Sequence, residues 1–263
     1  TTLFRSTVLD YANKINTLAY EVFAIGIAMI VYPTLSELAA KENKTEYKKA
    51  LGRAINIIML IMVPAAMAIA VLREPLITVI FKRGAFNDEA AKLTASALLF
   101  YCPAMIAYGI RDILNKAFYS IKDTKTPMIN SFIGIAINIG INIFIVKYMK
   151  VSGLTLATTI SAIITTILMA WNLNKKLEGI ELRKLTNGFF KILASSAIMG
   201  GIIFIINKAS MYRFGPEMKG SLISLIVSFV IGMFVYFLSV YLFKVEEYNQ
   251  IIDGLKKRKA VKK

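Results

Sequence analysis

Seven stretches of this sequence are long and apolar enough to cross a lipid bilayer, and this feature limits the fold more than any other. They lie at about residues 13–38, 48–72, 90–119, 127–149, 152–175, 187–207 and 219–243. A segment inside lipid has to satisfy its own backbone hydrogen bonds, so apolar runs of this length are expected to be α-helices. The sequence therefore predicts an all-α integral membrane protein with about seven transmembrane helices.

The composition narrows the chemistry available to the chain. Hydrophobic residues make up 57% of it, it has no histidine, and its single cysteine, Cys102, lies inside an apolar run. These facts exclude disulfides, zinc sites of the Cys/His type and catalysis that depends on histidine. No carboxylates near the spans pair as an acid and a base, and no Gly-x-x-x-x-Gly-Lys sequence is present. We therefore expect no enzyme activity, no metal site and no required cofactor.

The first apolar segment carries polar side chains where a simple membrane helix has none. Lys14, Thr17 and Glu21 are spaced so that a helix places them on one face. Charge at membrane depth costs a few kcal/mol or more and persists mainly beside a polar cavity or a partner. This spacing favours a helix that forms one wall of a hydrophilic pathway. The alternative is that Lys14 reaches the interface and Glu21 pairs with it or with a neighbouring helix.

Three further local features carry structural predictions. Helix 1 is expected to end near Pro33, and Pro64 is expected to kink helix 2 and to free a carbonyl that neighbours satisfy. The apolar segment within 73–92 is too short to span, so we expect a separate short helix in the membrane interface. Asn130, Gly134, Asn138 and Asn142 recur every four residues along the fourth span. This stripe either packs a neighbour closely or lines a site.

The distribution of charge predicts an orientation. The chain has 32 Lys and Arg against 16 Asp and Glu, and loops after helices 1, 3 and 5 together with the tail hold roughly twice as many basic residues as the other loops. The positive-inside bias then places the C-terminus in the cytoplasm and the first residue outside. A start outside the membrane leads us to expect that an odd number of helices precedes this chain. The basic tail is expected to meet anionic lipid and not nucleic acid.

Five short motifs, in order, resemble those of the bacterial lipid II flippases of the MurJ/MviN family. Residues 118–127 resemble the family's F-Y-x-x-x-D-T-K-T-P, and residues 11–14 resemble Y-A-D-R. Residues 33–36, 81–86 and 153–158 resemble P-S-L-S, F-x-x-G-x-F and G-L-A-L-A-T. Five motifs in register across this length are far more specific than any one of them.

The resemblance implies an architecture. The family belongs to the multidrug/oligosaccharidyl-lipid/polysaccharide exporter superfamily, in which two six-helix lobes face a central cavity, with two extra C-terminal helices in this family. By that likeness residues 1–177 form the second-lobe bundle without its first helix, residues 178–245 form the extra pair, and residues 246–263 form a basic cytoplasmic tail. The extra pair is implied to shape a groove for a polyprenyl tail.

The resemblance also implies two sites. Lys14 occupies the family's basic cavity position, which engages the lipid-linked pyrophosphate, and Asn13, Thr17 and Glu21 lie beside it. Lysine keeps the charge of the usual arginine without its bidentate fork, Asn13 replaces an Asp, and Glu21 replaces a small residue. A sodium site is implied at four positions, which are Asn138, Asn142, Thr158 and the Leu154 carbonyl. Asn142 stands where the family has an Asp, and oxygen ligands without a carboxylate hold a cation weakly.

The function implied by the resemblance is transport of lipid II from the inner to the outer leaflet of the bacterial inner membrane by alternating access. Its partners would be lipid II, membrane lipids and an N-terminal lobe that this chain lacks. Two alternatives stay open from the residues. One is another exporter of the superfamily, for polysaccharide lipids, drugs or cations. The other is a membrane scaffold that does not transport.

Overall fold

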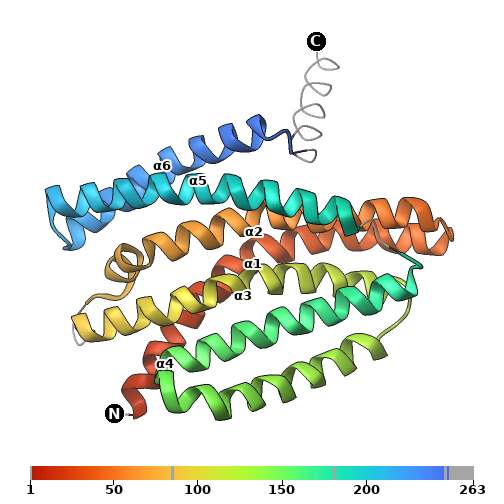
Figure 1. Cartoon of the computed structure of the whole chain (residues 1–263), viewed down its shortest axis with the longest axis horizontal. Coiled ribbons are helices and arrows are strands. Elements are labelled where there is room, and N and C mark those ends of the chain that lie inside the picture. The colour runs from red at the N-terminus through yellow and green to blue at the C-terminus, as the bar shows by residue number, and fades with distance from the viewer. Residues whose placement is uncertain (1, 84–85, 180–181, 246–247, 249–263) are drawn as a thin grey trace.

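The computed structural model describes residues 2–83, 86–179, 182–245 and 248, and over this part of the chain it consists of helices and short connections. The helices are α1 (Thr2–Ala40), α2 (Lys44–Phe81), α3 (Asp88–Ser120), α4 (Lys125–Lys176), α5 (Leu182–Phe214) and α6 (Met218–Leu242). Figure 1 shows that α4 folds back on itself as two antiparallel legs, which comprise residues 125–149 and 152–176. Within these described residues, seven helical segments are thus long and apolar enough to span a membrane, which confirms the predicted number.

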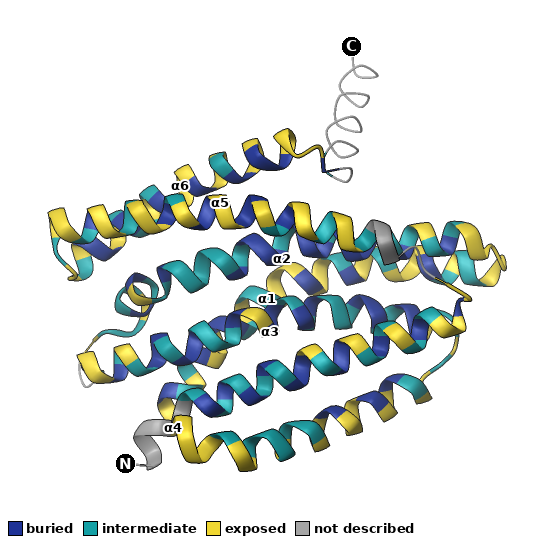
Figure 2. Ribbon diagram, viewed as in Figure 1, coloured by how far each residue is buried: buried dark blue, intermediate teal, exposed yellow. Residues whose placement is uncertain are grey.

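The helices lie side by side in layers, with α2 near the centre (Figure 1). On one side α2 packs against α5 and α6, and on the other it packs against α1 and α3. The two legs of α4 follow α3 and form the opposite edge. Burial is highest in the middle of this arrangement and falls toward its edges, as the colours of Figure 2 show. In the first leg of α4, only 11% of the most apolar window is buried, against 56% in α2.

The main apolar core lies where α2 meets α1, α3 and α5. Phe118 of α3, together with Leu51, Ile58 and Met62 of α2, is fully buried there. These apolar side chains recur at helical spacing along α2, so one stripe of the helix can pack on each neighbour. A smaller second core joins the start of α1, the end of α2 and the start of α3.

Two predicted boundaries are wrong. α1 continues past Pro33 to Ala40, and α2 continues past Pro75 to Phe81, so the segment after residue 73 is no separate helix. Proline removes one helical hydrogen bond, but packing compensates for this loss. In the second case Ile77 is fully buried against Val8 and Leu98, which draws the end of α2 into the smaller core.

The prediction that a neighbour satisfies the carbonyl freed by Pro64 is confirmed, whereas the kink stays a prediction. Pro64 lies inside α2, and a proline leaves the carbonyl four residues earlier without its helical partner. That carbonyl belongs to Leu60, and it accepts a hydrogen bond of 2.6 Å from the buried Tyr236 hydroxyl of α6. The hydrogen bond satisfies the carbonyl and fixes α6 on α2.

The pair α5–α6 packs on α2 as a distinct layer. Ser224 of α6 donates a hydrogen bond of 2.7 Å to the Asn207 side chain of α5, and Gly232 of α6 lies against Ile203 of α5. The predicted boundary at 177/178 falls in the turn that follows α4, and the division into lobe and extra pair stays a prediction. The tail from residue 246 lies outside the described residues apart from Tyr248, whose ring stacks on Phe237 at 6.0 Å.

Candidate functional site

The predicted polar face of α1 is open along most of its length. Asn13, Lys14 and Glu21 are exposed, and Thr17 is partly buried. Neither Lys14 nor Glu21 forms an ion pair with any residue that the structure describes, so the alternative in which they neutralise each other or a neighbouring helix finds no support here. The exposed side of the same helix also carries Leu18, at 62% exposure. α1 thus presents charge within a largely apolar surface.

Aromatic rings hold the position of Lys14. Its ammonium lies 5.3 Å from the centroid of the Tyr11 ring, a cation–π contact. Tyr11 in turn stacks on Phe81 with ring centroids 4.4 Å apart, and the Phe86 ring meets its edge at 5.5 Å. Two motifs that are far apart in the sequence, at 11–14 and at 81–86, therefore meet in one aromatic cluster beneath Lys14.

A second group of polar side chains joins α1 to α3. The Tyr20 hydroxyl donates a hydrogen bond of 2.6 Å to the Asp112 carboxylate. The Arg111 guanidinium lies 4.8 Å from the centroid of the Tyr108 ring, and Tyr108 lies 5.9 Å from Tyr20. Arg111 and Asp112 of α3 are therefore each paired with a tyrosine, close to Glu21 of α1. Arg111 and Asp112 fall inside the predicted span 90–119, but no pattern in the sequence points to their tyrosine partners.

The four residues of the predicted cation site come together between the two legs of α4. Asn142 donates to the Asn138 side-chain oxygen at 3.0 Å, and the Asn138 amide lies 3.4 Å from the Thr158 hydroxyl oxygen. The Thr158 hydroxyl donates to the Leu154 carbonyl at 2.9 Å. The Asn142 side-chain oxygen is buried and accepts no hydrogen bond from the part of the chain that the structure describes, so it is an orphaned oxygen in a set of neutral oxygens. Such a set fits a weakly held monovalent cation better than a divalent one.

The asparagine stripe also packs the hairpin of α4. Asn172 donates to the Asn130 side-chain oxygen at 3.0 Å, and the Ser161 hydroxyl donates to the Gly134 carbonyl at 2.6 Å. A Cβ atom at Gly134 would lie 2.4 Å from the Thr165 hydroxyl oxygen, so glycine is needed for this close approach. The stripe therefore packs closely against a neighbour, which confirms one of the two roles that the sequence left open, and its part in a cation site stays a prediction.

Three loops meet at one end of the molecule. Lys44, at the start of α2, pairs with Glu178 after α4 at 3.2 Å, and Lys176 pairs with Asp123 in the connection between α3 and α4. Burial raises the pKa of Asp123, but hydrogen bonds from Lys176 and Thr126 outweigh it and lower that pKa to about 2. The loops that the charge distribution assigns to the cytoplasm thus share one end of the bundle.

Comparisons with known proteins agree with this fold. A sequence model of the family described as lipid II flippase MurJ matches residues 5–228. A relative from Bdellovibrio bacteriovorus, named probable lipid II flippase MurJ, is 22% identical over 241 residues, which cover 92% of this chain and 46% of that protein. One of the same name from Rhizobium tropici is 25% identical over 259 residues, which cover 95% of this chain and 48% of that protein.

A solved structure described as lipid II flippase MurJ, inward closed conformation, superposes with a TM-score of 0.76 at 23% identity. The match covers 94% of this chain and 48% of that one, and it shows a common fold. The chain spans about half the length of the curated relatives it matches.

Proposed function

This chain belongs to the lipid II flippase MurJ family, and from that premise we propose that it supplies part of a transporter that moves lipid II across the bacterial inner membrane. The direction is from the inner to the outer leaflet, by alternating access. The observation that carries the proposal is the open charged face of α1. There Lys14 rests on Tyr11 without an acidic partner among the described residues.

Lys14 is suited to bind the pyrophosphate of the lipid. Its ammonium is a compact cation, and a low-dielectric surface around it strengthens its attraction for an anion. The face of α1 that carries it would look toward the other lobe of the intact transporter. Asn13 and Thr17 would add hydrogen bonds to the headgroup, and Glu21 would sit at the far end of the same face. Transport of this kind makes and breaks no covalent bond of the lipid.

Sodium fits the oxygens between the legs of α4. Asn138, Asn142, Thr158 and the Leu154 carbonyl would hold it, with the orphaned Asn142 oxygen as the first free ligand. A bound sodium ion would supply positive charge that ties the two legs together. In this proposal the protein lies in the inner membrane with its C-terminus in the cytoplasm, on the side of the three joined basic loops.

The test replaces Lys14 in the intact protein. A host depleted of its own copy is complemented with wild type, Lys14→Ala, Lys14→Arg or the control Lys147→Ala, an exposed lysine on the first leg of α4. The amount of lipid II on each face of the membrane is then measured. We expect Lys14→Ala to accumulate lipid II on the cytoplasmic face, and Lys14→Arg and Lys147→Ala to behave like wild type. Normal distribution in Lys14→Ala would remove Lys14 from substrate binding.

A further inference from the structure

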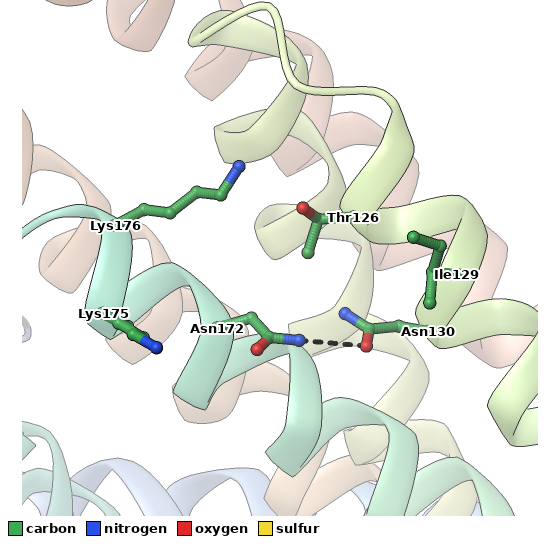
Figure 3. A pocket seen from close by; sticks show the side chains of 6 residues that line it. All are labelled: Thr126, Ile129, Asn130, Asn172, Lys175 and Lys176. Carbon is green, nitrogen blue, oxygen red and sulfur yellow. Dashed lines mark hydrogen bonds between the residues drawn. The ribbon is translucent and has the colours of Figure 1, made fainter.

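A pocket of about 550 Å³ opens where the two ends of the α4 hairpin meet, outside the charged face of α1. Figure 3 shows the six residues that line it, which are Thr126, Ile129, Asn130, Asn172, Lys175 and Lys176. Five of them are polar or basic, and none is acidic. The lining therefore offers hydrogen-bond donors and positive charge to whatever enters.

One hydrogen-bond donor in the pocket is not paired with any residue that the structure describes. Asn130 is 2% exposed, and its side-chain oxygen accepts the hydrogen bond from Asn172. Its amide nitrogen is buried and has no hydrogen-bond partner among the described residues. In Figure 3 this nitrogen points away from the first leg of α4, into the space between the two legs. A buried polar group without a partner costs free energy, so a ligand that accepts this hydrogen bond would be stabilised there.

The charge at the rim is only partly neutralised. Lys176 pairs with Asp123, whereas Lys175 is exposed and forms no ion pair with a described residue. Lys125 adds a further exposed cation at the start of α4. In the first turn of α4 the Asp123 carboxylate already accepts from the Thr126 N–H, so the attraction for an anion comes from the lysines. The pocket thus favours an anion with several acceptor oxygens, which is the chemistry of a phosphate group.

The surface next to the pocket is apolar. Ile129 lines the pocket and is 52% exposed, and Phe132 follows one turn later at 66% exposure. The exposed face of this leg continues with Ile133, Ile135 and Ile139. A ligand with a phosphate head and acyl chains could therefore place its head in the pocket and its chains along the first leg of α4.

We propose that this pocket binds the phosphate group of an anionic membrane phospholipid, through the Asn130 amide and the Lys175 ammonium. The site is separate from the one proposed for lipid II, and it does not depend on the protein being a flippase. The lipid would bridge the start of the first leg to the end of the second leg.

The test uses the intact protein, purified in detergent and placed in nanodiscs of phosphatidylcholine with or without phosphatidylglycerol. Native mass spectrometry counts the phosphatidylglycerol molecules that stay bound, and thermal unfolding reports the stabilisation. Asn130→Asp is nearly isosteric and can still accept from Asn172, but it replaces the free donor with an acceptor. Lys175→Gln changes only an exposed side chain, so it also covers the case in which Asn130→Asp fails to fold. Lys41→Gln is the control, an exposed lysine at the same end that does not line the pocket.

We expect wild type and Lys41→Gln to retain phosphatidylglycerol, and both pocket variants to lose affinity for it by at least about tenfold, as loss of a hydrogen bond or ion contact to a charged group predicts. Titration with inorganic phosphate in the absence of phosphatidylglycerol shows whether the bound phosphate group comes from a lipid or from free phosphate. One outcome would be that inorganic phosphate stabilises wild type but neither pocket variant, while phosphatidylglycerol stabilises none of the three proteins. The pocket would then bind phosphate, but its assignment to a lipid would be overturned. Equal retention of phosphatidylglycerol by wild type and both pocket variants would overturn the site itself.

Discussion

The Tyr236 hydroxyl donates a hydrogen bond of 2.6 Å to the Leu60 carbonyl, the group that Pro64 leaves without a partner inside α2. Tyr236 is 5% exposed, so no water replaces this bond when it is lost. Pro64 of α2 leaves the carbonyl without a helical partner, and Tyr236 of α6 satisfies it. This pairing holds the outer layer, α5 and α6, in register with the bundle.

Replacing Tyr236 by Phe should therefore lower the free energy of unfolding by about 1–3 kcal/mol, the usual cost of an unsatisfied buried acceptor. In a Pro64→Ala background the new backbone N–H can bond to Leu60, and the same replacement should cost much less. A double-mutant cycle in detergent measures the difference. Tyr241→Phe, at an exposed tyrosine of α6, is the matched control. Equal costs in both backgrounds would show that the two residues act independently.

Gly134 and Gly140 lie on the same leg of α4 and should respond in opposite ways to alanine. A Cβ atom at Gly134 would meet the Thr165 oxygen at 2.4 Å, whereas one at Gly140 has nothing within 4 Å. Gly134→Ala should destabilise by about 1–3 kcal/mol through overpacking. Gly140→Ala should be neutral or stabilising by up to about 1 kcal/mol. Thermal unfolding compares them, and Thr165→Ala should rescue Gly134→Ala; absence of rescue would rule out the contact.

The aromatic cluster beneath Lys14 should matter for transport even though it carries no charge. Tyr11→Phe keeps both the ring stack on Phe81 and the face offered to Lys14, so we expect near-normal flipping of lipid II. Tyr11→Leu and Phe81→Ala remove the support and should lower the rate several-fold, because a loosely held cation binds less well. Flux in proteoliposomes of the intact protein, corrected for folded protein, measures this. A normal rate of lipid II flipping in Tyr11→Leu would show that the aromatic cluster is not needed for transport.

Sodium binding between the legs of α4 can be tested without transport. Wild type should be weakly stabilised by sodium chloride relative to choline chloride, measured as a change in melting temperature. Asn142→Asp adds a carboxylate beside Asn138 and should strengthen the effect by about tenfold in apparent affinity. Asn138→Ala should abolish it. A sodium effect of the same size in all three proteins would place the cation elsewhere.

The pair between Asp123 and Lys176 should show itself in the dependence of stability on pH. The pKa of Asp123 is lowered to about 2, so the stability that its charge contributes is complete above the ordinary value of about 4 and is lost as the pH falls through about 2. Asp123→Asn should lower the melting temperature at pH 7, and the gap to wild type should close toward pH 2. Glu178→Gln breaks a pair whose carboxylate side chain is 73% exposed and should change little at any pH. A gap that does not depend on pH would exclude the ion pair as its cause.

The sequence predicted which side chains share one face of a helix, but not which neighbouring helix packs against that face. Periodicity placed Asn130, Gly134, Asn138 and Asn142 on one face, and the structure packs that face against the second leg of α4. Proline signals were less reliable, because Pro33 and Pro75 stay inside helices whose packing offsets the lost hydrogen bond.

Patterns within one segment could not predict contacts between residues that are far apart in the sequence. Tyr20 and Asp112 are 92 positions apart, and nothing near either residue marks the other. Tyr11 and Phe81 each begin a short motif that was recognised by itself, and only the fold shows that the two motifs form one cluster. Spacing along a helix fixes the direction of a side chain, whereas its partner depends on how separate helices pack.

The central place of α2 has a mechanical consequence. It packs on α1 and α3 through one face and on α5 and α6 through another, so displacements of the bundle reach the outer pair through this helix. A helix bends most easily at proline, so α2 is expected to bend at Pro64 and Pro75. Since Tyr236 donates to Leu60, four residues before Pro64, this hydrogen bond ties α6 to the segment of α2 on the N-terminal side of that proline. Gly200 of α5 lies against Met67 on the C-terminal side, so the outer pair contacts α2 on both sides of the point where it would bend.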